Sequence, residues 1–116
     1  MNIIFANKKL EKYANDSKLA QRKLGDKRAE LFNRRLGDMR DSESFDVLKY
    51  LPGNYHSLSS NRLGEWGCDL DQPYRLIFSG IGDTSGDNPP KGDNPPKLSD
   101  IRIVRIIEIV DYHKGH

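Results

Sequence analysis

The sequence predicts a small α+β domain in which helices come first and a sheet follows. Apolar residues recur every three or four positions between residues 8 and 40, which is the period of a helix. From residue 65 onward apolar and polar residues alternate, which is the period of a strand. The 116 residues suffice for one hydrophobic core but not for two. We therefore expect a single domain, residues 1–116, with an N-terminal helical pair packed on a small, mainly antiparallel, twisted sheet.

The first part of the chain predicts a brief strand followed by basic helices. Residues 2–5 are apolar over a length that fits only a short strand. Capping residues at positions 15–17 can divide the helical stretch that starts at Lys8. Gly25 then predicts a helix end, and Asp26 a new N-cap. The apolar positions of the next helix are Ala29, Phe32, Leu36 and Met39.

Two later segments are rich in turn-forming residues. Ser44 is predicted to cap a further helical turn or two, which Pro52 and Gly53 end. Residues 80–100 contain an uninterrupted tandem repeat of Gly-Asp-Asn-Pro-Pro-Lys. Paired prolines cannot take part in a strand ladder, so we expect a flexible external insertion loop there.

The strands follow from alternating patterns. Residues 65–70 and 74–80 alternate, and the short joint between them predicts a hairpin. Residues 101–110 are apolar on both sides, which is typical of a central strand. An unbroken alternation would place Val104 and Val110 on the same face of that strand.

Charge is unevenly distributed along the chain. The net charge is only +2, but residues 8–40 carry eleven basic and five acidic residues, while the rest carry eight and twelve. Such a basic block favours an anionic partner, either nucleic acid or an acidic protein. The alternative interpretation is a solvated helical face.

Cysteine usage and hydropathy indicate the compartment. Cys68 is the only cysteine, which excludes an internal disulfide and fits a reducing environment. No basic and apolar leader opens the sequence, and no apolar run has the length of a membrane span. We therefore expect a cytoplasmic protein without membrane contact.

Several motifs occur in a recognisable order. Leu-Pro-Gly at 51–53 precedes His56, a turn through Arg62 and Gly64, the strand Pro-Tyr-Arg-Leu-Ile-Phe at 73–78, and Asp-Tyr-His at 111–113. In order and spacing they resemble the RelE/ParE superfamily of bacterial toxins, and within it the HigB, or plasmid-maintenance killer, branch. The resemblance spans the chain except for the repeat loop.

The resemblance implies a RelE-like fold and a toxin of a type II toxin–antitoxin system. Such toxins enter the ribosomal A site and cut mRNA without a metal ion, because a ribose 2′-hydroxyl attacks the adjacent phosphate. A helix-turn-helix antitoxin neutralises the toxin and binds operator DNA. The branch counterparts of His56, Asp111, Tyr112 and His113 are implicated in cleavage, and no cofactor is expected. One turn departs from the pattern, since Ser59 and Leu63 replace two lysines.

The residue types fit this chemistry. Histidine suits either proton role near neutral pH, so His56 and His113 can divide the base and acid roles in either order. Asp111 either orients His113 or forms a cap or ion pair. Tyr112 either stacks on a base or packs in the core.

The cationic residues are candidates for contacts with RNA, and some of them could form ion pairs within the protein instead. Arg62 and Arg75 are candidates for the scissile phosphate, and an ion pair of Arg75 with Asp69 or Glu65 is the plain alternative. The pairs at 8–9, 27–28 and 34–35 are candidates for contacts with ribosomal RNA. His113 and His116 lack further ligands nearby, so a metal site is not expected.

Two other functions fit the same resemblance. One is a ParE-like toxin that inhibits DNA gyrase, although the histidines at 56 and 113 favour a nuclease. The other is a decayed toxin that only binds its antitoxin, which the substitutions at Ser59 and Leu63 favour.

Overall fold

A five-stranded sheet and three α-helices make up the domain within the residues that the computed structural model describes, which are 1–59, 62, 64–82 and 97–112. In chain order the elements are β1 (Asn2–Phe5), α1 (Lys8–Asn15), α2 (Ser17–Leu24), α3 (Asp26–Asp41), the 3-10 helix η1 (Phe45–Tyr50), β2 (His56–Ser57), β3 (Trp66–Asp69), β4 (Tyr74–Ile81), the 3-10 helix η3 (Leu98–Asp100) and β5 (Ile103–Asp111). The predicted α+β class is confirmed.

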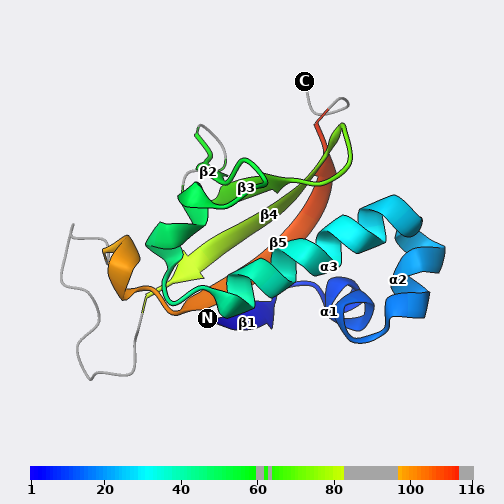
Figure 1. The fold of residues 1–116 in the computed structure, drawn as a ribbon, viewed down its shortest axis with the longest axis horizontal. Coiled ribbons are helices and arrows are strands. Elements are labelled where there is room, and N and C mark those ends of the chain that lie inside the picture. Colours follow the sequence, from blue (N-terminus) through cyan, green and yellow to red (C-terminus); the bar gives the residue numbers. More distant parts are fainter. Residues whose placement is uncertain (60–61, 63, 83–96, 113–116) are drawn as a thin grey trace.

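The sheet is mixed, with the strand order β1-β5-β4-β3-β2 (Figure 1). β1 pairs with β5 in parallel, and the other three pairings are antiparallel. β5 therefore lies inside the sheet, as its apolar sequence on both sides predicted. The predicted hairpin is also present, because β3 and β4 are neighbours joined by a turn that contains the cis peptide bond Gln72–Pro73.

Side-chain caps divide the helical half of the chain. The side chain of Asp16 accepts a hydrogen bond from the amide of Leu19, so α1 and α2 are separate helices, as predicted. Gly25, with a φ of 87°, separates α2 from α3. Asp26 is the first residue of α3 rather than its N-cap. Its negative charge in the first turn interacts favourably with the helix dipole instead.

The segment after α3 differs from the prediction in one detail. η1 begins after Ser44, but the Ser44 hydroxyl donates to the Asp46 carboxylate and caps no backbone amide. η1 ends at Tyr50, before Pro52, because proline disfavours the helical conformation of the residue that precedes it.

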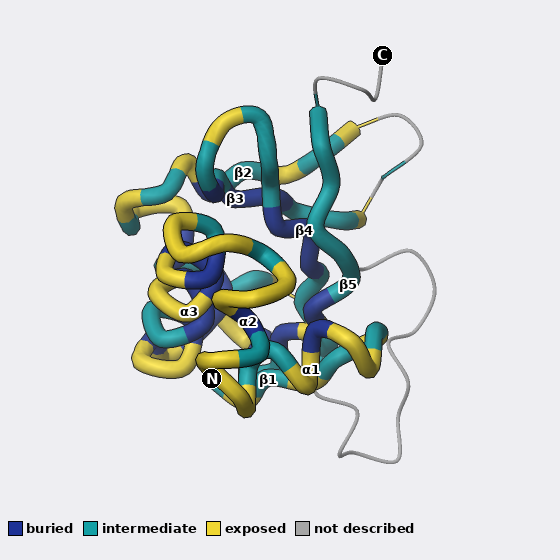
Figure 2. Tube along the Cα trace, turned by 90° about the vertical axis from the view of Figure 1, so that its right-hand side faces the viewer, coloured by how far each residue is buried: buried dark blue, intermediate teal, exposed yellow. Residues whose placement is uncertain are grey.

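The main core lies between α3, η1 and one face of the sheet. Figure 2 shows the buried stretches of the chain, in dark blue, in α3 and in the strands β3, β4 and β5. From the helical part, the buried residues of this core are Leu10, Leu31, Phe32, Leu36, Met39, Phe45 and Leu48. α3 supplies four of them and α1 only Leu10, so α3 provides most of the helical side of the core.

A β-bulge exchanges the two faces of β5. Ile77 pairs with Glu108, but the next residue, Phe78, pairs with Ile106, which leaves Ile107 as the extra residue. The predicted unbroken alternation along β5 is therefore wrong. Val104 lies on the core side and is fully buried, whereas Val110 lies on the opposite side of the sheet.

The sheet consequently has two chemically different faces. The core face carries Cys68, Leu76, Phe78, Val104 and Ile106. The opposite face, called here the open face, carries His56, Gly67, Asp69, Arg75, Ile77, Glu108 and Val110. Most polar candidates for a site thus lie on the open face.

The predicted insertion loop is shorter than expected at both ends. β4 continues through Ile81, and residues 98–100 form η3. Residues 83–96, which hold most of the repeat, lie outside the described part of the chain. Among the described helices, none has the length and apolar character needed to cross a membrane.

Replacing Phe45 with alanine tests the packing of η1 on the sheet. The ring is 1% exposed and lies 5.1 Å from the Trp66 ring and 5.7 Å from the Phe78 ring, measured between centroids. We expect Phe45→Ala to lower the free energy of unfolding by about 3–5 kcal/mol in urea denaturation. Tyr50→Ala is the matched control, because the Tyr50 side chain is 79% exposed. A decrease of equal size in the control would contradict this account of the core.

Candidate functional site

The strand register places His56 in a row of open-face residues. His56 on β2 pairs with Gly67, Gly67 with Ile77, and Ile77 with Glu108. Residues paired in this way have side chains on the same face. The row therefore joins a histidine at one edge of the sheet to a carboxylate on β5, across a glycine and a fully buried isoleucine.

A left-handed turn fixes the His56 ring. Asn54 has a φ of 55°, a conformation that asparagine tolerates better than most residues, and its carbonyl oxygen lies 2.7 Å from Nδ1 of His56. A carbonyl only accepts hydrogen bonds, so Nδ1 carries the proton of the neutral ring. Nε2 is then the basic nitrogen.

Arg62 bridges two carboxylates above the open face. Its Nη1 lies 2.9 Å from Oε1 of Glu65, and its Nη2 lies 3.4 Å from Oε2 of Glu108. The hydrogen bond to Glu65 is the largest cause that raises the pKa of Arg62 above its ordinary value. Because Glu108 belongs to β5, Arg62 reaches across the sheet.

Arg75 connects the open face to the end of β5. Its Nε lies 3.4 Å from Oδ1 of Asp69, and its guanidinium carbon lies 4.3 Å from the centre of the Tyr112 ring. Arg75 therefore forms the ion pair with Asp69 that the sequence offered as the alternative to a phosphate contact. The pair is long, and Asp69 Oδ1 is buried without a hydrogen bond, so the attraction between this oxygen and Arg75 is electrostatic.

His56 and Arg75 lie on the same face but are not in contact. They are two strands apart, roughly 10 Å across the sheet, and Arg75 lies two residues along β4 from Ile77, the residue in the His56 row. Tyr112 is fixed next to Arg75 because its amide donates to the Pro73 carbonyl at 3.1 Å. The site thus offers a base at one end and a cation with an aromatic ring at the other.

The remaining predicted catalytic residues are placed differently. Asp111 pairs with Tyr74, whose neighbour Arg75 points to the open face, so Asp111 lies on the other side of β5 from Tyr112. His113 lies outside the described residues, as does His116. In the described part of the chain, no group of histidine, cysteine, aspartate and glutamate could hold a metal ion.

Two arginines predicted to contact RNA bind other parts of the protein. Arg35 is only 8% exposed, so its assignment to a surface contact is wrong. Arg28 forms two hydrogen bonds with the Asp71 carboxylate, at 2.9 and 3.1 Å, and stacks 3.4 Å above the Tyr74 ring. One signal in the sequence could have indicated the burial of Arg35, because this residue lies four positions from the apolar residues 31 and 39 on the core side of α3.

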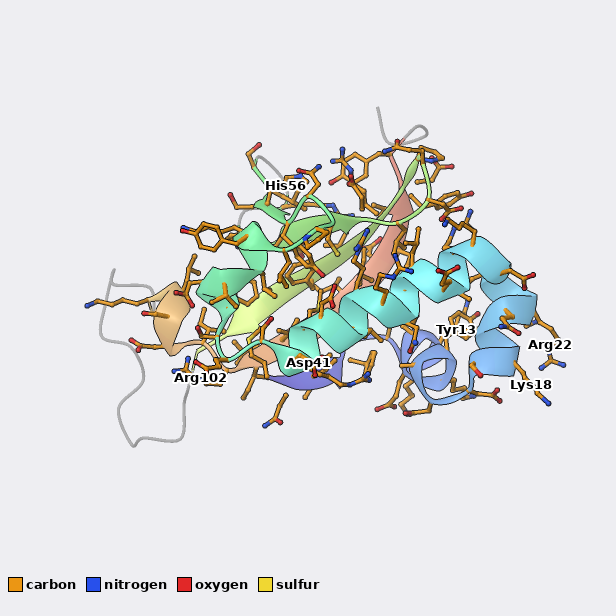
Figure 3. The ribbon with its side chains drawn as sticks, viewed as in Figure 1. Tyr13, Lys18, Arg22, Asp41, His56 and Arg102 are labelled. Carbon is orange, nitrogen blue, oxygen red and sulfur yellow. The ribbon has the colours of Figure 1, made fainter. Side chains whose placement is uncertain are left out.

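Other basic side chains of the helices do face solvent. The exposed ones are Lys8, Lys9, Lys12, Lys18, Arg22, Lys23, Lys27, Arg34 and Arg40. Figure 3 shows Lys18 and Arg22 at the outer end of α2, well separated from His56 at the β2 edge of the sheet. The basic surface and the open-face residues are therefore distinct regions.

Comparisons with known proteins place the chain in no family. No protein-family model, no curated protein and no solved structure matches it.

The core contains a buried thiol, Cys68 on β3, and a buried phenol, Tyr55 just before β2, which predict an alkaline loss of stability. Burial raises the pKa of Cys68 from 9.0 to about 12, and burial also raises the pKa of Tyr55. The unfolded thiol ionises first as the pH rises, so the stabilisation is complete below pH 9 and is lost towards about pH 12. Urea unfolding between pH 9 and about pH 12 should show that the free energy of unfolding falls as the pH rises, and in Cys68→Ala it should fall less steeply. An equal dependence of the free energy of unfolding on pH in wild type and variant would contradict the assignment to Cys68.

Proposed function

We propose that this chain is the toxin of a type II toxin–antitoxin system, a ribosome-dependent endonuclease that cuts mRNA without a metal ion. The observation that supports it best is that His56, Arg75 and Tyr112 share one sheet face, with Nε2 of His56 as the basic nitrogen. These residues also occupy the positions at which the sequence resembles the HigB branch.

The proposed reaction begins at His56. Nε2 accepts the proton of a ribose 2′-hydroxyl, whose oxygen then attacks the adjacent phosphorus. The bond from phosphorus to the 5′-oxygen breaks, and that oxygen takes a proton from an acid. The products are a 2′,3′-cyclic phosphate and a 5′-hydroxyl. In this proposal the acid is His113. The resemblance also implicates Asp111, although its position on β5 turns it away from the open face.

The arginines bind the phosphate by exchanging partners. Arg62 and Arg75 are about one third exposed, and each faces a carboxylate in the free protein. The more exposed of these pairs, Arg62 with Glu108, is of the kind that contributes only about 0–1 kcal/mol, so a phosphodiester can replace the Glu108 carboxylate at little cost. Tyr112, adjacent to Arg75, then offers its ring to a neighbouring base.

The proposal includes the partners and the compartment. The chain acts in the cytoplasm, where it meets ribosomes and mRNA. A cognate helix-turn-helix antitoxin neutralises it, and operator DNA is bound only through that antitoxin. The exposed basic residues of α1 and α2 provide the phosphate-directed surface that ribosomal RNA requires.

A second candidate function has a specific observation in its favour. Both arginines of the site are neutralised by carboxylates, and Ser59 and Leu63 stand where the branch has lysines. A decayed toxin that still binds its antitoxin would show the same features. A ParE-like inhibitor of DNA gyrase is the third candidate.

Expression in growing bacteria distinguishes the three functions. An mRNA endonuclease predicts growth arrest with transcripts that are cut inside translated regions. A gyrase inhibitor predicts arrest with a DNA-damage response and intact transcripts. A decayed toxin predicts unimpaired growth, and either of the last two outcomes contradicts the proposal.

His56→Gln tests the proposed base. Glutamine keeps a polar side chain of similar length but accepts no proton near neutral pH, so we expect cleavage on programmed ribosomes to slow by about 10²–10⁴-fold. Ser57→Ala is the control, because Ser57 pairs with Trp66 and points to the other face of the sheet. Equal cleavage by wild type and His56→Gln would remove His56 from the mechanism.

The salt dependence of ribosome association tests the basic helices. Replacing both Lys18 and Arg22 with serine should weaken binding and reduce the slope of log affinity against log salt by about 0.7 for each RNA phosphate that the variant no longer neutralises. The control is Lys49→Ser, which removes an exposed lysine of η1 instead. An unchanged slope in the double variant would show that the outer end of α2 does not bind RNA.

A further inference from the structure

Arg35 is a buried cation bound to the backbone. Its Nε donates to the Asp69 carbonyl at 2.8 Å, and its Nη1 donates to the Pro52 carbonyl at 3.2 Å. Within the described residues, no carboxylate lies at ion-pair distance from it. A buried charge is costly unless it is paired or hydrogen-bonded, and the carbonyls of Asp69 and Pro52 supply hydrogen bonds to this one.

The two segments that Arg35 binds also bind each other. The amide of Asp69 donates to the Gly53 carbonyl at 2.7 Å. Gly53 has a φ of 125°, and a Cβ there would approach Cζ of Arg35 to 2.8 Å. Glycine is therefore required by its conformation and by the closeness of the guanidinium.

Each segment leads directly to a residue of the site. The turn at Pro52 and Gly53 continues to Asn54, whose carbonyl fixes the His56 ring at Nδ1. At the end of β3, Asp69 holds Arg75 through its carboxylate. A displacement of either segment would change the His56 tautomer or the direction of Arg75.

We propose that Arg35 is a positioning residue that sets the geometry between His56 and Arg75 from the opposite side of the sheet. Its Nε and Nη1 bind the carbonyls of Asp69 and Pro52 through one rigid, planar guanidinium, whereas the donors of an ammonium have no such fixed geometry. The effect on activity rests on the proposed nuclease function, whereas the effect on the His56 ring does not.

Nitrogen NMR of the imidazoles in the full chain tests the proposal. The His56 signals, assigned by their disappearance in His56→Gln, should show a protonated Nδ1 and a bare Nε2 in the wild type. In Arg35→Lys and in Gly53→Ala we expect this signature to shift towards the mixed tautomers of a solvated ring. Arg34→Lys is the control, because Arg34 is exposed and pairs with Glu30 rather than with the backbone near the site.

Ribosomal cleavage is the second measurement. Arg35→Lys and Gly53→Ala should cut mRNA on ribosomes up to about 100-fold more slowly than wild type, since small displacements of reacting groups have effects of this size. A wild-type His56 signature in both folded variants would overturn the proposal. If Arg35→Lys does not fold, Gly53→Ala decides alone, since it disturbs the same interaction from the loop side. Altered tautomers together with a wild type that cuts no RNA would support the positioning role and contradict the nuclease.

Discussion

The binding of the Arg35 guanidinium to two backbone carbonyls is the constraint on which the candidate site depends. It connects the middle of α3 to the turn before β2 and to the end of β3, so one side chain joins three segments far apart in the sequence. The apolar core alone would hold α3 against the sheet. Asn54 itself is exposed, although Tyr55 beside it is buried in the core, so its carbonyl, which orients His56, also depends on the turn that Arg35 binds.

A second constraint decides which residues can work together. The bulge at Ile107 turns Glu108 and Val110 to the open face while Ile106 stays in the core. Without it, the alternation would bring Glu108 to the same face as Ile106. The bulge therefore decides which residues at the end of β5 face the site: Glu108 and Val110 do, and Glu108 meets Arg62 there, whereas Ile109 packs against the core.

Periodicity predicted the elements but not the contacts between them. The strand at residues 2–5, the division at Asp16, the hairpin and the interior position of β5 follow from local patterns, and the structure has them. The bulge could not be predicted, because residues 101–110 are apolar on both sides and an added residue leaves no mark in such a pattern.

The site was only partly predictable for a similar reason. Arg75 beside Asp69 follows from a hairpin with a short turn, so the register could be anticipated. The pairing of Arg62 with Glu108 joins residues that are 46 positions apart in the sequence, and charge patterns along a sequence carry no such information.

The chemical end group of the cut mRNA tests the central claim most directly. Fragments produced by wild-type protein on programmed ribosomes should end in a 2′,3′-cyclic phosphate, and fragments that end in a 3′-hydroxyl would contradict the attack by a 2′-oxygen.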